Sequence, residues 1–118
     1  MVAEIERIIS KLNDISGVKG SFLVSMDGFI IAEVLPKNIS KDDAGATLSA
    51  SYGALSVSFE ELKQGAVKFV IAEGENGNVF LISVDDSAVL GVLADTSANL
   101  GYIRMQMNKI VPELSALL

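Results

Sequence analysis

Large apolar side chains recur at three- and four-residue steps through the first fifteen positions of the chain. Charged residues, including Glu4, Arg7 and Lys11, fall between them. This spacing is close to the helical repeat of about 3.6 residues, so one face of the segment is apolar and the other is polar. The pattern therefore predicts an amphipathic helix whose apolar positions are Val2, Ile5, Ile8, Ile9, Leu12 and Ile15.

Two apolar stretches, 21–25 and 29–35, flank the dipeptide Asp27-Gly28. This dipeptide favours the two-residue type I′ turn that joins antiparallel strands, because both residues tolerate a positive φ. Pro36 follows the second stretch and lacks the N–H that a continuing strand needs. These residues predict a β-hairpin that ends before Pro36.

A second helix is predicted after the hairpin. Ser40 can cap its first turn, and Asp42 and Asp43 place negative charge where the helix dipole is positive. We expect this helix to run to about Lys63 and to be ended by Gly65, because Gly readily takes the left-handed conformation found just beyond many helices.

Three further apolar stretches cover residues 66–73, 78–84 and 88–94. The segments between them, 75–77 and 85–87, consist of residues that favour tight turns, mainly Asn, Asp, Gly and Ser. The pattern predicts three strands that are joined by short hairpins in an antiparallel meander.

The last helix is predicted after Asp95 and Thr96, either of which can cap it. Pro112 lies inside the helical pattern and removes one backbone donor, so we expect a kink or an early end there. The apolar positions of this helix are Leu100, Ile103, Met107, Ile110, Leu114 and Leu117.

The predicted order of elements is helix, two strands, helix, three strands, helix, or αββαβββα. Residues 79–82 and 89–93 are apolar in succession, which is typical of strands that are covered on both faces. We therefore expect an α+β fold, a three-layer α/β/α sandwich with helices on both sides of a five-stranded antiparallel sheet. A chain of 118 residues has the usual size of one domain, so we expect a single domain over residues 1–118.

The strand predicted at 66–73 should form a bare edge of the sheet. It is apolar, and only Lys68 and Glu73 carry charges that would oppose pairing with another chain. Pairing with a second copy is the simplest way to cover such an edge. The candidate dimer-interface residues on this strand are Val67, Phe69, Val70 and Ile71.

The outward surface of the second helix is small and uncharged. Gly45, Ser49 and Gly53 form a ridge of small side chains along one flank. A face in contact with water alone would carry Lys and Glu. The stripe that should face the sheet, given a rotation of about 100° per residue, consists of Leu48, Tyr52, Leu55, Phe59 and Leu62.

Two interpretations of the ridge remain open. It either accommodates a helix or loop of the same chain, or it packs against a second copy and adds Gly45, Ser49 and Gly53 to the dimer interface. Gly inside a helix costs about 0.8–1.0 kcal/mol relative to Ala, so both interpretations need a close contact in return. The outward positions that we assign to the binding of another protein are Ala46, Ala50, Gly53, Ser56 and Val57.

Composition excludes several classes of function. Nine Lys and Arg stand against fifteen Asp and Glu, and a net charge of −6 repels a nucleic acid backbone. The chain has neither Cys nor His, which removes thiolate chemistry and the commonest general base and transition-metal ligand. No stretch approaches the roughly 20 apolar residues of a membrane span, and the start lacks the apolar segment of a signal peptide. We expect a cytoplasmic protein without a cofactor.

Carboxylates could still support acid–base chemistry or bind magnesium or calcium. The candidate pairs are Asp42 with Asp43 and Asp85 with Asp86. Adjacent residues on a helix point away from each other, and Asp is common in tight turns. Capping and turn roles therefore explain both pairs better than a catalytic or metal site does.

A nucleotide-hydrolysing site is not predicted either. The sequence has no GxxxxGK[ST] loop, whose backbone donors would hold a phosphate. Arg7 and Arg104 are the only arginines that could act in trans on a nucleotide bound to another protein. The charged faces of two amphipathic helices already explain both residues.

The order of elements and several local motifs together resemble the Roadblock family, the dynein light-chain Roadblock type that includes bacterial and archaeal MglB-like proteins. The motifs are residues 15–20 leading into the hairpin 22–33, the small-residue middle helix, and the segment 98–101 followed by Ile103 and Arg104. The resemblance covers nearly the whole chain.

That resemblance implies a profilin-like or Roadblock-like sheet whose third strand pairs with its mate in a homodimer, with the middle helices side by side. It also implies a noncatalytic scaffold or regulator that binds a small Ras-like GTPase and in some members stimulates GTP hydrolysis. The alternative function is a regulatory module that holds a small metabolite in the dimer cleft. An enzyme is the least favoured reading.

Overall fold

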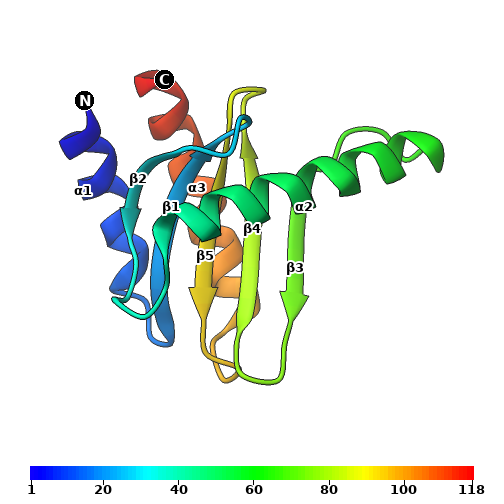
Figure 1. Ribbon diagram of the computed structural model, residues 1–118. Helices are drawn as coiled ribbons and strands as arrows, with labels where there is room; N and C mark the ends of the chain where they lie inside the picture. Colours follow the sequence, from blue (N-terminus) through cyan, green and yellow to red (C-terminus); the bar gives the residue numbers. More distant parts are fainter.

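The computed structural model describes the whole chain, residues 1–118. Its elements follow the predicted order (Figure 1). They are α1 (Val2–Asn13), β1 (Val18–Ser25), β2 (Ile30–Val34), α2 (Lys41–Glu61), β3 (Phe69–Glu73), β4 (Asn78–Val84), β5 (Ala88–Ala94) and α3 (Leu100–Leu117). The predicted α+β fold with five strands is confirmed, and β4 and β5 have the predicted bounds.

The sheet has the strand order β2-β1-β5-β4-β3, and every neighbouring pair is antiparallel. Helices α1 and α3 cover one face of the sheet, and α2 crosses the other face (Figure 1). The three-layer arrangement is therefore the predicted one. Strand β3 lies at one edge of the sheet and pairs only with β4.

The two faces of the sheet bury very different amounts of apolar surface. Toward α1 and α3 lies a cluster of 17 buried residues, whereas the cluster on the α2 side has 6. Burial of one large apolar side chain contributes about 1.5–3 kcal/mol, so the α1 and α3 side supplies most of the hydrophobic stabilisation. Helix α2 is held by few buried contacts, and most of its surface is exposed.

The turn between β1 and β2 is not the predicted type I′ turn. Such a turn needs a positive φ at both central residues, but only Gly28 has one, at 91°, and Asp27 does not. The Gly28 N–H donates to the Ser25 carbonyl at 3.0 Å, so the chain turns over Ser25–Gly28 and Gly28 takes the left-handed position. This longer loop delays the start of β2 to Ile30 and leaves Phe29 outside the strand.

Helix α2 ends at Glu61, before the predicted Lys63. Lys63 itself takes the left-handed conformation, with φ 59°, and the N–H of the following residue donates to the Phe59 carbonyl at 2.8 Å. This is the Schellman arrangement, which does not require Gly, and it ends the helix before Gly65. Leu62 was predicted to face the sheet but is 66% exposed, because the end of α2 projects beyond β3 (Figure 1).

Helix α3 is capped by Asn99 and not by Asp95 or Thr96. The Asn99 Oδ1 accepts the backbone N–H three residues later at 2.9 Å, which satisfies one of the free donors of the first turn. Pro112 does not end the helix, because α3 continues through it to the last turn of the chain. No helix combines the length and the apolar character that crossing a bilayer requires.

Candidate docking surface on α2 and β3

Helix α2 is long but almost unburied. Of its 21 residues only Gly45 and Tyr52 are buried. Residues 44–59 include no charged side chain, and the charges of the helix lie in its first and last turns. Helix surfaces that contact only water usually carry Lys and Glu. The middle of α2 is therefore an exposed, uncharged surface with few contacts inside the chain.

Gly45, one of the predicted dimer contacts, lies against another part of its own chain. A Cβ at this position would lie 2.7 Å from the Gly28 carbonyl oxygen and 3.2 Å from Cγ1 of Ile30. The missing side chain lets the β1–β2 turn approach the backbone of α2. Ser49 lies at the same contact, since a Cβ on Gly28 would be 3.0 Å from the Ser49 Oγ. At these two positions the ridge accommodates a loop of the same chain, and the dimer contact of Gly45 and Ser49 stays a prediction.

Gly53 is different, because a Cβ there would have no heavy atom within 4 Å. Nothing in the single chain accounts for Gly at this position of the helix. Ala46, Ala50 and Val57 are also exposed, Val57 to 61%. Ser56 is half-buried, and its hydroxyl donates to a carbonyl one turn earlier at 2.9 Å. The residues assigned to partner binding thus remain accessible, with Ser56 the least so.

Val67 was assigned to the dimer interface, but the structure places it before β3 and inside the chain. It is 5% exposed, and its carbonyl accepts the Tyr52 hydroxyl at 2.8 Å. The side chain and the carbonyl of Val67 are thus engaged within the chain, and its dimer contact stays a prediction. The bond ties the middle of α2 to the segment that leads into the edge strand.

The other three candidates lie on β3 itself. Phe69 packs edge-to-face against Phe80, with ring centroids 6.4 Å apart, and the Arg104 guanidinium carbon lies 4.7 Å from the Phe69 ring centroid. Val70 is half-buried on the α2 side, and Ile71 is 37% exposed. The backbone groups on the outer side of β3 have no partner strand in the chain. Such an edge is a template for another strand.

Two hollows open beside α2. One, of about 400 Å³, lies between α2 and the segment before β3, and its lining includes Tyr52, Gly53, Ser56 and Glu60. The other, of about 410 Å³, lies where the β1–β2 turn meets the first turns of α2. It is lined by Asp27, Gly28, Phe29, Asp42, Ala46 and Ser49.

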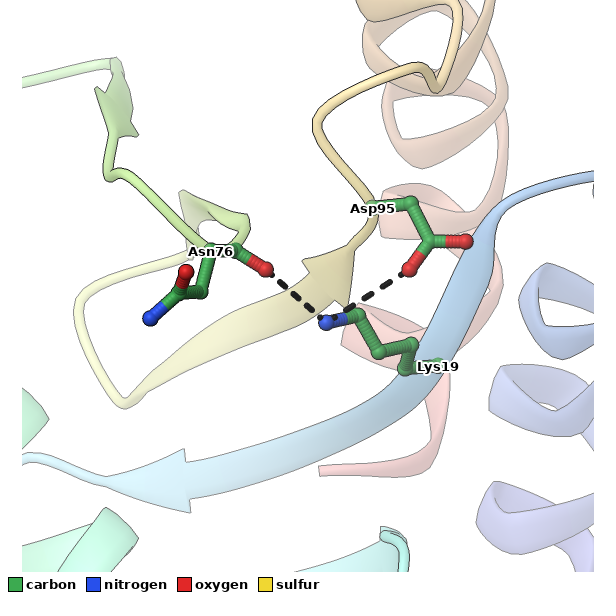
Figure 2. A network of polar contacts seen from close by, with 3 residues as sticks. All are labelled: Lys19, Asn76 and Asp95. Carbon is green, nitrogen blue, oxygen red and sulfur yellow. Dashed lines mark hydrogen bonds and ion pairs between the residues drawn. The ribbon is translucent and has the colours of Figure 1, made fainter.

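A third hollow, of about 490 Å³, lies where β4 begins and β5 ends, next to Lys19. The Lys19 ammonium donates to the Asn76 carbonyl at 3.2 Å and lies 3.5 Å from the Asp95 carboxylate, as Figure 2 shows. Both charged side chains are about half exposed, at 45% and 52%, so the ion pair is worth at most about 1 kcal/mol. The contacts join the start of β1 to the β3–β4 turn and to the chain beyond β5, which is a structural role.

The two carboxylate pairs considered for acid–base chemistry lie in a turn and at a helix cap. Asp85 adopts a positive φ of 54° in the β4–β5 turn, and its carboxylate accepts the Ser115 hydroxyl from the end of α3. The backbone N–H of Asp43 donates to the Ser40 hydroxyl at 3.3 Å, which caps α2. No group of three or more Asp and Glu side chains gathers where it could hold a metal ion.

Sequence reasoning missed Met26 and Phe29, two exposed apolar residues of the β1–β2 turn. Phe29 is 73% exposed and Met26 is 42% exposed. The available signal was their position beside Asp27-Gly28, because apolar residues in a tight turn are seldom covered by the sheet. Phe29 begins the apolar run 29–35, which is typical of a strand, so the sequence did not mark it as a turn residue.

Comparison with known proteins identifies the same fold. The family model described as the Roadblock/LC7 domain matches residues 4–94. An uncharacterised protein of Methanocaldococcus jannaschii is 34% identical over 113 residues, which cover 96% of this chain and 98% of that protein. The Ragulator complex protein LAMTOR2 homolog of Caenorhabditis elegans is 30% identical over 101 residues, which cover 84% of this chain and 77% of the relative.

Among solved structures, Myxococcus xanthus MglB superimposes with a TM-score of 0.92 at 20% sequence identity, covering 98% of this chain and 88% of the MglB chain. At this level of identity the superposition shows a shared fold. The match extends over all the elements that carry the α2 and β3 surfaces.

Proposed function

Because the chain belongs to the Roadblock/LC7 family, we propose that it is a cytoplasmic, noncatalytic regulator or scaffold that forms a homodimer and binds a small Ras-like GTPase. The observation that carries the proposal is the middle of α2, where residues 44–59 have no charge and only Gly45 and Tyr52 are buried. The Roadblock resemblance implies this class of partner. A relative that is named as part of the Ragulator complex supports a role in assemblies.

The homodimer forms through the outer edge of β3 and the flank of α2 at Gly53. Two features support this interface: the backbone on the outer side of β3 has no partner strand, and Gly53 is a helical Gly with no neighbour. The proposed interface residues are Phe69, Val70, Ile71, Ser49 and Gly53. Val67 and Gly45 are left out because both are buried within the chain. We also propose that residues 1–118 act as one domain.

The GTPase contact consists of Ala46, Ala50, Gly53, Ser56 and Val57. A catalytic arginine from this chain is not part of the proposal. Arg104 stacks on Phe69 at the α3 side of the sheet, and Arg7 lies on α1. Both helices cover the face opposite α2, so neither guanidinium points to a GTPase docked on α2. Any stimulation of GTP hydrolysis would act by ordering the GTPase's own residues.

Titration calorimetry with a Ras-like GTPase encoded by the same genome, loaded with GDP or a GTP analogue, tests the partner. We expect binding in at least one nucleotide state and a loss of about tenfold in affinity for Val57→Glu, which corresponds to about 1.4 kcal/mol. Met105→Glu, a change at a similarly exposed position on α3, is the matched control and should bind as the wild type does. Absence of binding in every nucleotide state would contradict the proposed partner.

Light scattering tests the homodimer separately. Gly53→Leu adds bulk at a position that is open in the single chain, and Ile71→Lys adds a charge at the β3 edge. We expect both variants to shift the mass toward that of a monomer while circular dichroism stays unchanged. A dimer mass in both variants, or a monomer mass for the wild type, would be incompatible with this interface.

The second candidate function is the binding of a small metabolite. The observation in its favour is the hollow of about 400 Å³ beside Gly53 and Ser56, which a second copy would close at the proposed dimer contact. Native mass spectrometry of the purified dimer tests it: a retained small molecule that is lost in Gly53→Leu supports this function, and an empty dimer opposes it.

A further inference from the structure

We propose that the hollow between the β1–β2 turn and α2 receives an arginine side chain of the bound partner, between the carboxylates of Asp27 and Asp42 and against the ring of Phe29. This inference rests on the proposed function, because it names chemistry that the docked protein supplies. The hollow measures about 410 Å³. It shares Ala46 with the proposed GTPase contact, so it continues that surface.

The carboxylate of Asp27 makes no hydrogen bond or ion pair within the chain. An Asp in a turn usually accepts a nearby backbone N–H, but here the Phe29 N–H donates to the Ser25 hydroxyl at 3.2 Å. The Asp42 carboxylate lies in the first turn of α2, where its charge favours the helix dipole, but it caps no backbone N–H because the Ser40 hydroxyl does so. The single ion pair of the chain joins Lys19 to Asp95, so both Asp27 and Asp42 are without a cationic partner.

Phe29 is the most exposed aromatic residue of this surface, at 73%. Both backbone groups of Phe29 are hydrogen-bonded to Ser25. Its N–H donates to the Ser25 hydroxyl, and its carbonyl accepts the Ser25 N–H at 2.8 Å. The turn is held against α2 by the close approach of Gly28 and Gly45. An exposed aromatic ring on a fixed backbone, at the rim of a hollow, is typical of an anchor for a binding partner.

A guanidinium group matches this combination. It donates to two carboxylates through a planar fork, and it stacks on aromatic rings better than an ammonium does. The chain contains the same pairing internally, where the Arg104 guanidinium carbon lies 4.7 Å from the Phe69 ring centroid. A net charge of −6 favours a basic surface on the partner. An apolar side chain would leave both carboxylates unpaired.

The test uses N-acetyl-arginine methylamide as the probe and the amide NMR spectrum of the ¹⁵N-labelled full chain as the readout. We expect saturable shifts at the amides of Gly28, Ala46 and Ser49 with the arginine probe, and none with the matching citrulline probe, which has the same shape without charge. Equal shifts with citrulline, or no saturable shift with arginine, would overturn the inference.

Variants sharpen the test. Asp27→Asn together with Asp42→Asn should weaken the arginine probe about fivefold, the upper end for an exposed charge pair. Phe29→Leu should weaken it while keeping the apolar volume, and Glu4→Gln on α1 is the control that should change nothing. All four substitutions lie at exposed positions, so the amide spectrum will show whether each variant is folded.

The alternative occupant of the hollow is a second copy of the chain. If Phe29→Leu or the double Asp variant lowers the mass in light scattering, the hollow belongs to the contact between copies and the inference fails. The arginine titration needs no GTPase, so its outcome is separate from that of the proposed function. Binding of the arginine probe without binding of a GTPase would contradict only the proposed partner. Binding of a GTPase without binding of the arginine probe would contradict only the arginine site.

Discussion

The ring of Phe22 on β1 lies directly over the bare backbone of Gly91 on β5. The two residues are opposite each other in the antiparallel register, and a Cβ on Gly91 would be 2.1 Å from Cζ of Phe22. Phe22 is fully buried, so its ring is surrounded by other atoms of the core. A Gly inside a strand often marks such a close approach.

We therefore expect Gly91→Ala to lower the free energy of unfolding by about 1–3 kcal/mol, the usual cost of overpacking a core. The loss should be smaller in a chain that already carries Phe22→Leu, because the shorter side chain leaves room for the new methyl group. Urea unfolding of the two single variants and the double variant measures the coupling. Additive losses would show that the ring and Gly91 do not interact.

Two glycines of α2 should respond in opposite directions to the same substitution. Gly45→Ala should destabilise the chain by about 1 kcal/mol, because the clash with the Gly28 carbonyl outweighs the gain in helix propensity. Gly53→Ala should stabilise it by about 0.8–1.0 kcal/mol, since its Cβ meets nothing. Urea unfolding at concentrations where light scattering shows a monomer makes the comparison. The same sign for both variants would contradict the assigned contacts.

Asn99→Ala should lower the free energy of unfolding by about 0.5–2 kcal/mol, because the side chain accepts a backbone N–H that then loses its partner. Thr96→Ala removes the hydroxyl that the sequence alone offers as a cap, and it should change the stability by less than about 0.5 kcal/mol. Thermal unfolding followed by circular dichroism distinguishes the two. If Thr96→Ala lowered the free energy of unfolding more than Asn99→Ala does, Thr96 would be the capping residue, as the sequence predicted.

The chain should unfold as one cooperative unit. Tyr52 lies on the buried side of α2 and Tyr102 lies on α3, so the two tyrosines report on opposite faces of the sheet. In Tyr52→Phe and Tyr102→Phe variants, the remaining tyrosine signal should change at the same urea concentration as the far-ultraviolet circular dichroism. Tyr52→Phe should also cost about 1 kcal/mol, because the Val67 carbonyl loses its donor. Separate transitions would contradict a single domain over residues 1–118.

The α2 residues show how far prediction of the candidate site could go. The cap and stop residues predicted the helix, and the absence of charge in 44–59 indicated that its outward surface is small and uncharged. The ridge of small residues was visible too, but its neighbours were not. Gly45 contacts the β1–β2 turn, whereas Gly53 contacts nothing, and no spacing rule separates them because the turn is distant in sequence.

Local chemistry by itself determined the order of elements and the bounds of β4 and β5, because hydrophobic period and turn residues act over a few neighbouring positions. It did not determine which residue caps α3 or which residue ends α2, since several adjacent candidates could satisfy the same backbone groups. Only the tertiary structure decided that Val67 and Gly45 are occupied within the chain. It alone brings Asp27, Phe29 and Asp42 to one hollow, because that contact depends on how a turn and a helix pack across the sheet.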